Sequence, residues 1–211
     1  MKIIHSLKTL GDLATRIKYL AEINDLAFEN KEYINTIKHR GFYEKFTFQQ
    51  SISTVSINFL FITVCSFLDE YEKKLTPLNY PNHSSEILIL KKINSPAIRR
   101  IKKWIDLKNY RNTILAHNLV IKDKYIYSLE DPIKYNIPSN STEIKLLVKL
   151  ILIIAKNIGY AFPLLVNKID YSISISDIIL TNGDKIDFES EEKNILDKIE
   201  FLKKSTLNDQ N

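Results

Sequence analysis

The sequence predicts an all-α protein, a helical bundle of four to six helices with one or two small β-hairpins. Only 4 glycines and 6 prolines occur among 211 residues, so the chain has few residues that interrupt helices. Several long segments repeat apolar residues at the three- and four-residue spacing of one helix face. Two short segments alternate apolar and polar residues instead, or carry an Asn-Gly turn, which is typical of hairpins.

The first two helices are expected at residues 8–38 and at about 44–75. The first segment ends near Gly41, and glycine favours the C-terminal cap of a helix. The second contains a run without any charge, residues 46–68. Many residues of this run are Gln, Ser, Thr or Asn, and Lys and Arg are not biased to one flank. These features favour a helix buried in a bundle or a subunit interface over a membrane span.

Two more helices are expected after residues 75–83, a segment with two prolines: a short one at 84–92 and a longer one from 96 to about 118. Ser95-Pro96 predicts the start of the longer helix, with Ser as the N-cap and Pro at the first helical position. The apolar residues expected to anchor this helix in the core are Ile101, Trp104, Ile105, Ile114 and Leu115.

The following segment predicts a short hairpin within 119–129 and then a long helix. Asn140 and Glu143 form a pattern like a capping box, which predicts a helix that begins there and extends to about 167. Three lysines of this helix share one stripe expected to face solvent, namely Lys145, Lys149 and Lys156.

The C-terminal segment predicts a second hairpin at 176–188, with an Asn-Gly turn, and a last helix at about 190–204. We therefore expect residues 1–170 to form the helical bundle. Residues 171–211 are expected to add a hairpin and a helix that pack on the same domain.

Cysteine content and charge indicate the compartment and the partner. The single cysteine, Cys65, excludes an internal disulfide framework and a zinc site with several cysteines. The N-terminus has no uninterrupted apolar run of the secretory type, so a cytoplasmic protein is expected. Residues 91–125 carry ten Lys or Arg and two Asp, a net charge of +8. Such a segment is typical of a polyanion-binding surface, and a solvated lysine-rich helix face is the alternative.

Most reaction classes lack their sequence motif here. The chain has no glycine-rich phosphate loop, no His-Glu-x-x-His and no Gly-x-Ser-x-Gly. The 4 histidines are spread along the chain, which argues against a metal site. We expect no cofactor and no bound metal.

The segment YRNTILAHN, residues 110–118, carries the candidate active site: Arg111, Asn112 and His117. On a helix, six residues correspond to a rise of about 9 Å and an offset of about 120°, which a long arginine side chain largely spans. A guanidinium can hold a phosphate and an imidazole can transfer a proton, so the set suits RNA cleavage by the 2′-hydroxyl without a metal. The alternative is a chance pair in which His117 only caps the helix C-terminus.

This segment resembles the signature of the HEPN superfamily (higher eukaryotes and prokaryotes nucleotide-binding): an Arg, four to six residues and a His, often with Asn after the Arg. The wording Arg-Asn … Ala-His is similar to abortive-infection and toxin-type members. The resemblance covers about nine residues, and the order of helices agrees with it more loosely. It implies a HEPN-like bundle.

The resemblance further implies a metal-independent endoribonuclease of a toxin or antiphage system that leaves 2′,3′-cyclic phosphate ends. Arg111 would hold the phosphate, His117 would act as general acid and base, and Asn112 would orient the attacking group. Such proteins are often homodimers with a composite active site, and an antitoxin or another regulatory partner is possible. The basic residues that we expect to steer the RNA backbone are Lys103, Lys108 and Arg100.

Two alternatives stay open. Some HEPN proteins only bind RNA or nucleotides without cutting, and a helical dimerisation scaffold would explain the composition equally well. Leu119 stands where toxins paired with a nucleotidyltransferase antitoxin often have tyrosine, which puts that pairing in doubt.

Overall fold

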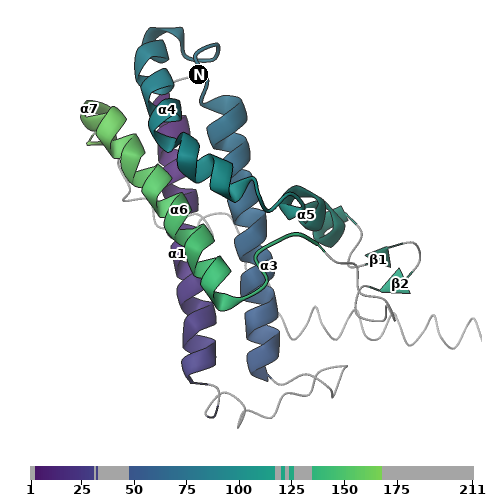
Figure 1. The fold of residues 1–211 in the computed structure, drawn as a ribbon. Coiled ribbons are helices and arrows are strands. Elements are labelled where there is room, and N and C mark those ends of the chain that lie inside the picture. The colour runs from purple at the N-terminus through teal and green to yellow at the C-terminus, as the bar shows by residue number, and fades with distance from the viewer. Residues whose placement is uncertain are drawn as a thin grey trace, which may run out of the picture. The chain divides into compact units, whose positions relative to one another are not determined.

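The structure is a computed structural model that describes residues 3–30, 32, 48–116, 120–121, 124–125 and 135–167. The chain divides into two compact units, Met1–Ile169 and Asp170–Asn211, and every described residue belongs to the first. The described part is almost entirely helical, which confirms the all-α class (Figure 1). The elements are α1 (Ile3–Glu29), α3 (Phe48–Asp69), the π-helix η1 (Glu70–Lys74), a 3-10 turn (Pro81–His83), α4 (Ser84–Ile101), α5 (Leu107–Ala116), β1 (Val120–Ile121), β2 (Lys124–Tyr125), α6 (Ser141–Ala161) and α7 (Pro163–Val166).

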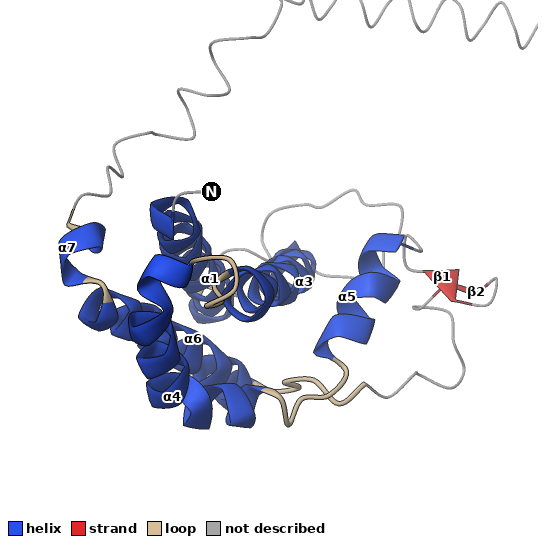
Figure 2. Cartoon of the chain, turned by 90° about the horizontal axis from the view of Figure 1, so that it is seen from above, coloured by secondary structure: helices blue, strands red, loops and turns tan. Residues whose placement is uncertain are grey.

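Helices α1 and α3 lie side by side and form the centre of the core, and α6 packs on α1 and α4 (Figures 1 and 2). The buried apolar residues of the first part of α1 follow one another at alternating four- and three-residue steps, as a helix seam requires: Ile3, Leu7, Leu10, Ala14 and Ile17. The described helix starts earlier than expected and ends at Glu29. The predicted remainder of this helix lies largely outside the described residues.

Several hydroxyl side chains of helix α3 donate to the backbone carbonyl one turn earlier. Ser56 donates to the carbonyl oxygen of Ile52 at 2.8 Å, and Ser66 donates to that of Ile62 at 3.1 Å. Such bonds let hydroxyls lie on an apolar helix without an unpaired donor. The helix of Phe48–Lys74 is long and apolar enough to cross a membrane, with 44% of its apolar window buried. A core helix of a soluble protein meets the same criteria, so the preference for a core helix stays a prediction.

The predicted helix start at Ser95-Pro96 is wrong, because α4 runs unbroken from Ser84 to Ile101 with Pro96 inside it. The buried residues of α4 form one stripe that continues across the proline: Ile87, Leu90, Asn94, Ala97 and Ile101. Burial of this stripe outweighs the hydrogen bond that proline removes. The carbonyl group that loses its donor belongs to Lys92, an exposed residue on the solvent side of α4.

The predicted helix over 96–118 is also wrong, because residues 102–106 form a turn between α4 and α5. The turn is held from outside: the Asp106 carboxylate accepts from the Asn136 N–H at 2.8 Å, and the Asp106 N–H donates to the Asn136 carbonyl at 3.2 Å. Trp104 is buried in the turn as predicted, whereas Ile105, predicted to be a core residue, is 71% exposed.

The start of α6 is confirmed in detail. The Asn140 side chain accepts from the Glu143 N–H at 2.9 Å, and the Glu143 carboxylate accepts from the Ser139 N–H at 2.9 Å. The three lysines of the predicted solvent stripe are exposed. The helix ends at Ala161 and the short α7 begins at Pro163, so the segment expected to be one helix up to 167 is two.

The hairpins stay predictions. Strands β1 and β2 pair antiparallel over two residues each, with Val120 opposite Tyr125 and Ile121 opposite Lys124. The residues between and around them lie outside the described residues, as do the predicted hairpin at 176–188 and the predicted helix at 190–204.

Candidate functional site

Helix α5, which carries Arg111, packs on α3 (Figure 2). Three contacts fix this packing. The Tyr110 ring lies edge-on to Phe61, with 5.6 Å between ring centres, and the Tyr110 hydroxyl donates to Asn58 Oδ1 at 2.8 Å. The buried Cys65 thiol donates to the carbonyl oxygen of Leu107 at 3.5 Å. The residue after Tyr110 is therefore held next to the C-terminal end of α3.

Cys65 itself is not a chemical candidate. Burial raises the pKa of its thiol, although the charges of Arg111 and Lys108 partly oppose that effect. A fully buried, protonated thiol is a poor nucleophile. Its contribution is to the packing of α5 on α3.

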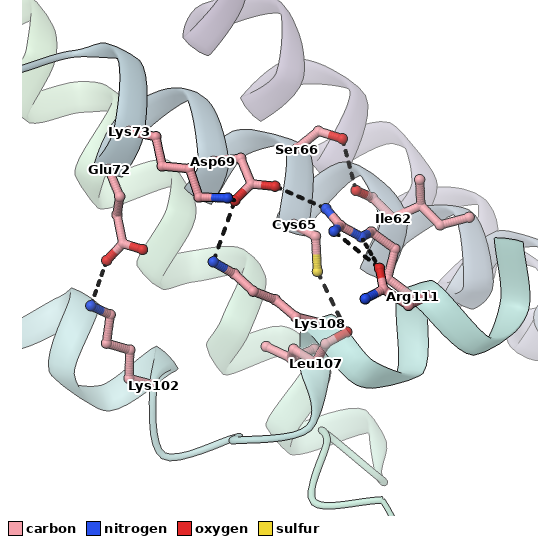
Figure 3. A network of polar contacts seen from close by, with 11 residues as sticks. Ile62, Cys65, Ser66, Asp69, Glu72, Lys73, Lys102, Leu107, Lys108 and Arg111 are labelled. Carbon is pink, nitrogen blue, oxygen red and sulfur yellow. Dashed lines mark hydrogen bonds and ion pairs between the residues drawn. The ribbon is translucent and has the colours of Figure 1, made fainter. Parts of the chain in front are cut away.

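The guanidinium of Arg111 is held from two sides (Figure 3). Its Nη1 donates to Asp69 Oδ2 at 2.9 Å, while Nε and Nη2 donate to Asn112 Oδ1 at 3.2 and 3.1 Å. Because a guanidinium only donates, Asn112 must turn its oxygen towards it, and its amide NH2 stays available for another acceptor. The structure thus brings two of the predicted site residues, Arg111 and Asn112, into direct contact.

Asp69, at the end of α3, is the centre of a cationic cluster. Besides Arg111, its carboxylate pairs with Lys73 Nζ at 2.9 Å and with Lys108 Nζ at 3.3 Å. Burial alone would raise the pKa of Asp69, but the hydrogen bonds from Lys73, Arg111 and Lys108 outweigh burial and hold it well below its usual range. The carboxylate is therefore ionised at neutral pH. Three cations around one carboxylate leave an excess of two positive charges.

A second ion pair lies beside this cluster, between Lys102 Nζ and Glu72 Oε1 at 2.6 Å (Figure 3). The π-helix η1 links the two groups, because it begins directly after Asp69 and carries both Glu72 and Lys73. Its first two residues, Glu70 and Tyr71, are buried. These buried residues anchor η1, while Lys73 contacts Asp69 and Glu72 contacts Lys102.

The predicted RNA-steering residues have different surroundings. Lys108 joins the Asp69 cluster. Arg100 instead lies over the ring of Trp104, with its Cζ 4.1 Å from the ring centre. Lys103 is exposed in the turn after α4 and forms no ion pair with a described residue. His117 lies outside the described residues, which end in this segment at Ala116.

Sequence reasoning missed Asp69, Lys73, Lys102 and Glu72. A weak signal exists: Asp69 is the first charge after the long uncharged run, and Lys73 follows at the four-residue spacing of a helical ion pair. The contact of Asp69 with Arg111 joins residues 42 positions apart and depends on the packing of α5 against α3.

The donors at this site suit an oxyanion. Three of the five guanidinium N–H groups of Arg111 are engaged, and the other two have no partner among the described residues. The Asn112 amide and the surplus charge add to them. No group of three or more His, Cys, Asp or Glu that could hold a metal occurs in the described ranges.

Comparison of the chain with protein-family models, with curated proteins and with solved structures finds no match. Any assignment of function therefore depends on the chemistry of the site and on the sequence resemblance.

Proposed function

We propose that the protein is a metal-independent endoribonuclease of the HEPN type, acting in a toxin or antiphage system. The observation that carries the proposal is the fixed guanidinium of Arg111, which keeps two N–H donors without a partner in the described structure, within a cluster of excess positive charge. A preorganised donor pair stabilises the charge that develops on a phosphate oxygen during attack. If the arginine side chain were mobile, the entropy cost of ordering it would offset part of that stabilisation.

The residues divide the chemistry among them. The RNA 2′-hydroxyl attacks the adjacent phosphorus, a 2′,3′-cyclic phosphate forms, and the 5′-oxygen leaves with a proton. Arg111 stabilises the phosphate, and the Asn112 NH2 group donates to it or to the attacking oxygen. His117, assigned by resemblance, takes up one proton and delivers the other. Lys108 attracts the RNA backbone.

The proposal includes a homodimer with a composite site, a cytoplasmic location and control by an antitoxin or another regulator. In the resembling family two copies of the motif face one another. The surplus charge near Arg111 would then be present twice around one RNA strand. A monomer in solution at micromolar concentration contradicts this part of the proposal.

The direct test is incubation of the purified protein with RNA in EDTA, followed by analysis of the product ends. Cleavage that yields 2′,3′-cyclic phosphate and 5′-hydroxyl ends is expected to survive EDTA and to disappear in Arg111→Ala and His117→Ala. The control Lys149→Ala removes a charge from the solvent face of α6 and should cut normally. Equal cleavage by all four proteins refutes the proposal.

One observation favours a second function, binding of RNA without cleavage. Asp69 already neutralises part of the Arg111 charge, and a carboxylate competes with a phosphate for the same donors. On this view the protein binds RNA in a salt-dependent way, and Arg111→Ala weakens binding while no cyclic phosphate is ever formed.

A further inference from the structure

A pocket that contains no residue of the Arg111 cluster, but lies beside it, opens between the π-helix η1 and α4. Its volume is about 290 Å³. The α4 residues that line it recur at three- and four-residue steps, so they share one face of the helix. The lining consists of Tyr71, Glu72, Lys91, Ser95, Ile98, Arg99 and Lys102.

The pocket is rich in positive charge and in donors. Three of its side chains are basic and one is acidic, and the acid, Glu72, already pairs with Lys102 at 2.6 Å. Arg99 is exposed and has no ion-pair partner among the described residues. Its five N–H groups and the Ser95 hydroxyl are therefore available to a ligand.

Lys91 forms the inner wall of the pocket without a carboxylate partner in the described structure. Its ammonium lies over the Tyr71 ring, 3.7 Å from the ring centre, and donates to the Tyr71 carbonyl oxygen. Burial is the main cause that lowers the pKa of Lys91 to about 8; Glu72 opposes this shift and the nearby Lys102 adds to it. No carboxylate in the described structure compensates the charge of this ammonium. An anionic ligand in the pocket would compensate it.

We propose that this pocket is a second anion site that binds a phosphate group, with Arg99, Lys102 and Lys91 as its cationic ligands. Donors spaced along α4, together with Lys102 directly after it, fit a tetrahedral anion with several oxygens better than a single carboxylate. The volume is at the lower limit for small-molecule pockets, so it fits a small phosphorylated compound or one segment of a longer chain.

Two sources can supply this phosphate: the backbone of single-stranded RNA, or a small phosphorylated molecule. Figure 3 shows Glu72, which pairs with Lys102, beside Lys73 of the Asp69 cluster, so the pocket borders the Arg111 site and one RNA strand is a candidate ligand for both. The phosphate site itself does not depend on cleavage, and it stands or falls separately from the ribonuclease proposal.

The test measures binding of two probes in EDTA. The first is a labelled single-stranded RNA with 2′-O-methyl riboses, which cannot be cut by its own 2′-hydroxyl, followed by fluorescence polarisation at several salt concentrations. The second is ATP, followed by titration calorimetry. The variants are Arg99→Gln and Arg99→Gln/Lys102→Gln. The control Lys149→Gln/Lys156→Gln loses the same charge from the solvent face of α6.

The double variant is expected to weaken at least one probe about tenfold or more relative to the control, the loss typical of removed charge-assisted hydrogen bonds. Arg99→Gln alone, which breaks no described ion pair, should give part of that loss with an unchanged circular dichroism spectrum. For RNA, the salt dependence should also fall by about 0.7 in slope for each lost phosphate contact.

Weakened RNA binding identifies the backbone as the source, and weakened ATP binding identifies a free phosphorylated compound. If neither probe loses more affinity in the double variant than in the control, the phosphate site is refuted. That result leaves the cleavage test of Arg111 and His117 untouched, because neither probe is a substrate for 2′-hydroxyl attack.

Discussion

Replacement of Asp69 by asparagine removes the one negative charge of the Arg111 cluster and leaves its shape almost unchanged. In the structure this carboxylate pairs with Lys73 and Arg111 at 2.9 Å each and with Lys108 at 3.3 Å. Asparagine keeps an oxygen that can accept from Arg111, so the variant isolates the effect of charge. Without the carboxylate, the three cations repel one another.

The expected loss follows from the number of pairs and their exposure. The Asp69 side chain is 25% exposed, so its pairs belong to the partly solvated class. Each such pair contributes about 0.2–1 kcal/mol, and the three together about 1–2 kcal/mol, since they share one carboxylate. Asp69→Asn is therefore expected to lower the free energy of unfolding by about 1–2 kcal/mol at neutral pH.

The same contribution must depend on pH with a defined sign. Because the pKa of Asp69 is depressed in the folded state, its stabilisation is complete above the ordinary aspartate value of 3.8 and disappears as the pH falls below it. The difference between wild type and Asp69→Asn is therefore largest at neutral pH and shrinks in acid. Addition of salt should reduce it as well.

Urea unfolding followed by circular dichroism, at neutral pH and through the acid range, measures this difference. The control is Glu22→Gln, which removes the carboxylate of a single exposed pair with Lys18 at 3.6 Å and should cost less than about 0.5 kcal/mol. An equal loss in both variants would refute the idea of a shared cationic cluster. So would a difference for Asp69→Asn that does not change with pH.

Three other substitutions test the fold by thermal or urea unfolding. Pro96→Ala restores a backbone donor inside α4 and should stabilise the protein by about 1–3 kcal/mol. Asn140→Ala removes the N-cap of α6 and should cost about 1 kcal/mol, whereas Asn140→Ser should cost little. Lys91→Met should stabilise by about 1–2 kcal/mol at neutral pH, after allowance for partial exposure. That gain should fade as the pH rises from about 8 towards 10.5, because burial penalises only the charged amine.

The start of α6 could be predicted from the sequence because its determinants are local. The Asn140 cap, the Glu143 carboxylate that reaches back and the lysine stripe lie within one helix. Their geometry depends only on helical spacing, so no knowledge of the rest of the chain was needed.

The boundary between α4 and α5 could not be predicted because its determinants are distant. Ser95-Pro96 is a strong local start signal, but the buried stripe of α4 continues through it. The real break has neither glycine nor proline. It depends on the exchange of hydrogen bonds between Asp106 and Asn136, residues 30 positions apart. Tertiary contacts therefore decide where these helices begin and end when they conflict with local helix propensity.

In the candidate site, too, some contacts depend on local sequence and others on distant residues. Arg111 and Asn112 are neighbours in the chain, so their contact follows from the motif itself. Asp69 meets them only because Tyr110 and the Cys65 thiol fix α5 against α3. Arg100 was expected to steer RNA on the strength of the local charge run alone. The structure places its guanidinium over the buried Trp104 ring, a contact that a charge run does not reveal, and its role towards RNA stays a prediction.

The number of cations around Asp69 bears on whether the protein cleaves RNA or only binds it. If Asp69 and Arg111 formed an isolated pair, a phosphate would have to displace the carboxylate and would gain little charge stabilisation. Here Lys73 and Lys108 compensate Asp69 as well, so under the proposed function a phosphodiester would occupy the N–H donors of Arg111 that have no partner among the described residues, while the carboxylate stays in place. In that arrangement Asp69 orients the guanidinium before the substrate arrives. Orientation of this kind is more useful to a transition state than to simple retention of RNA.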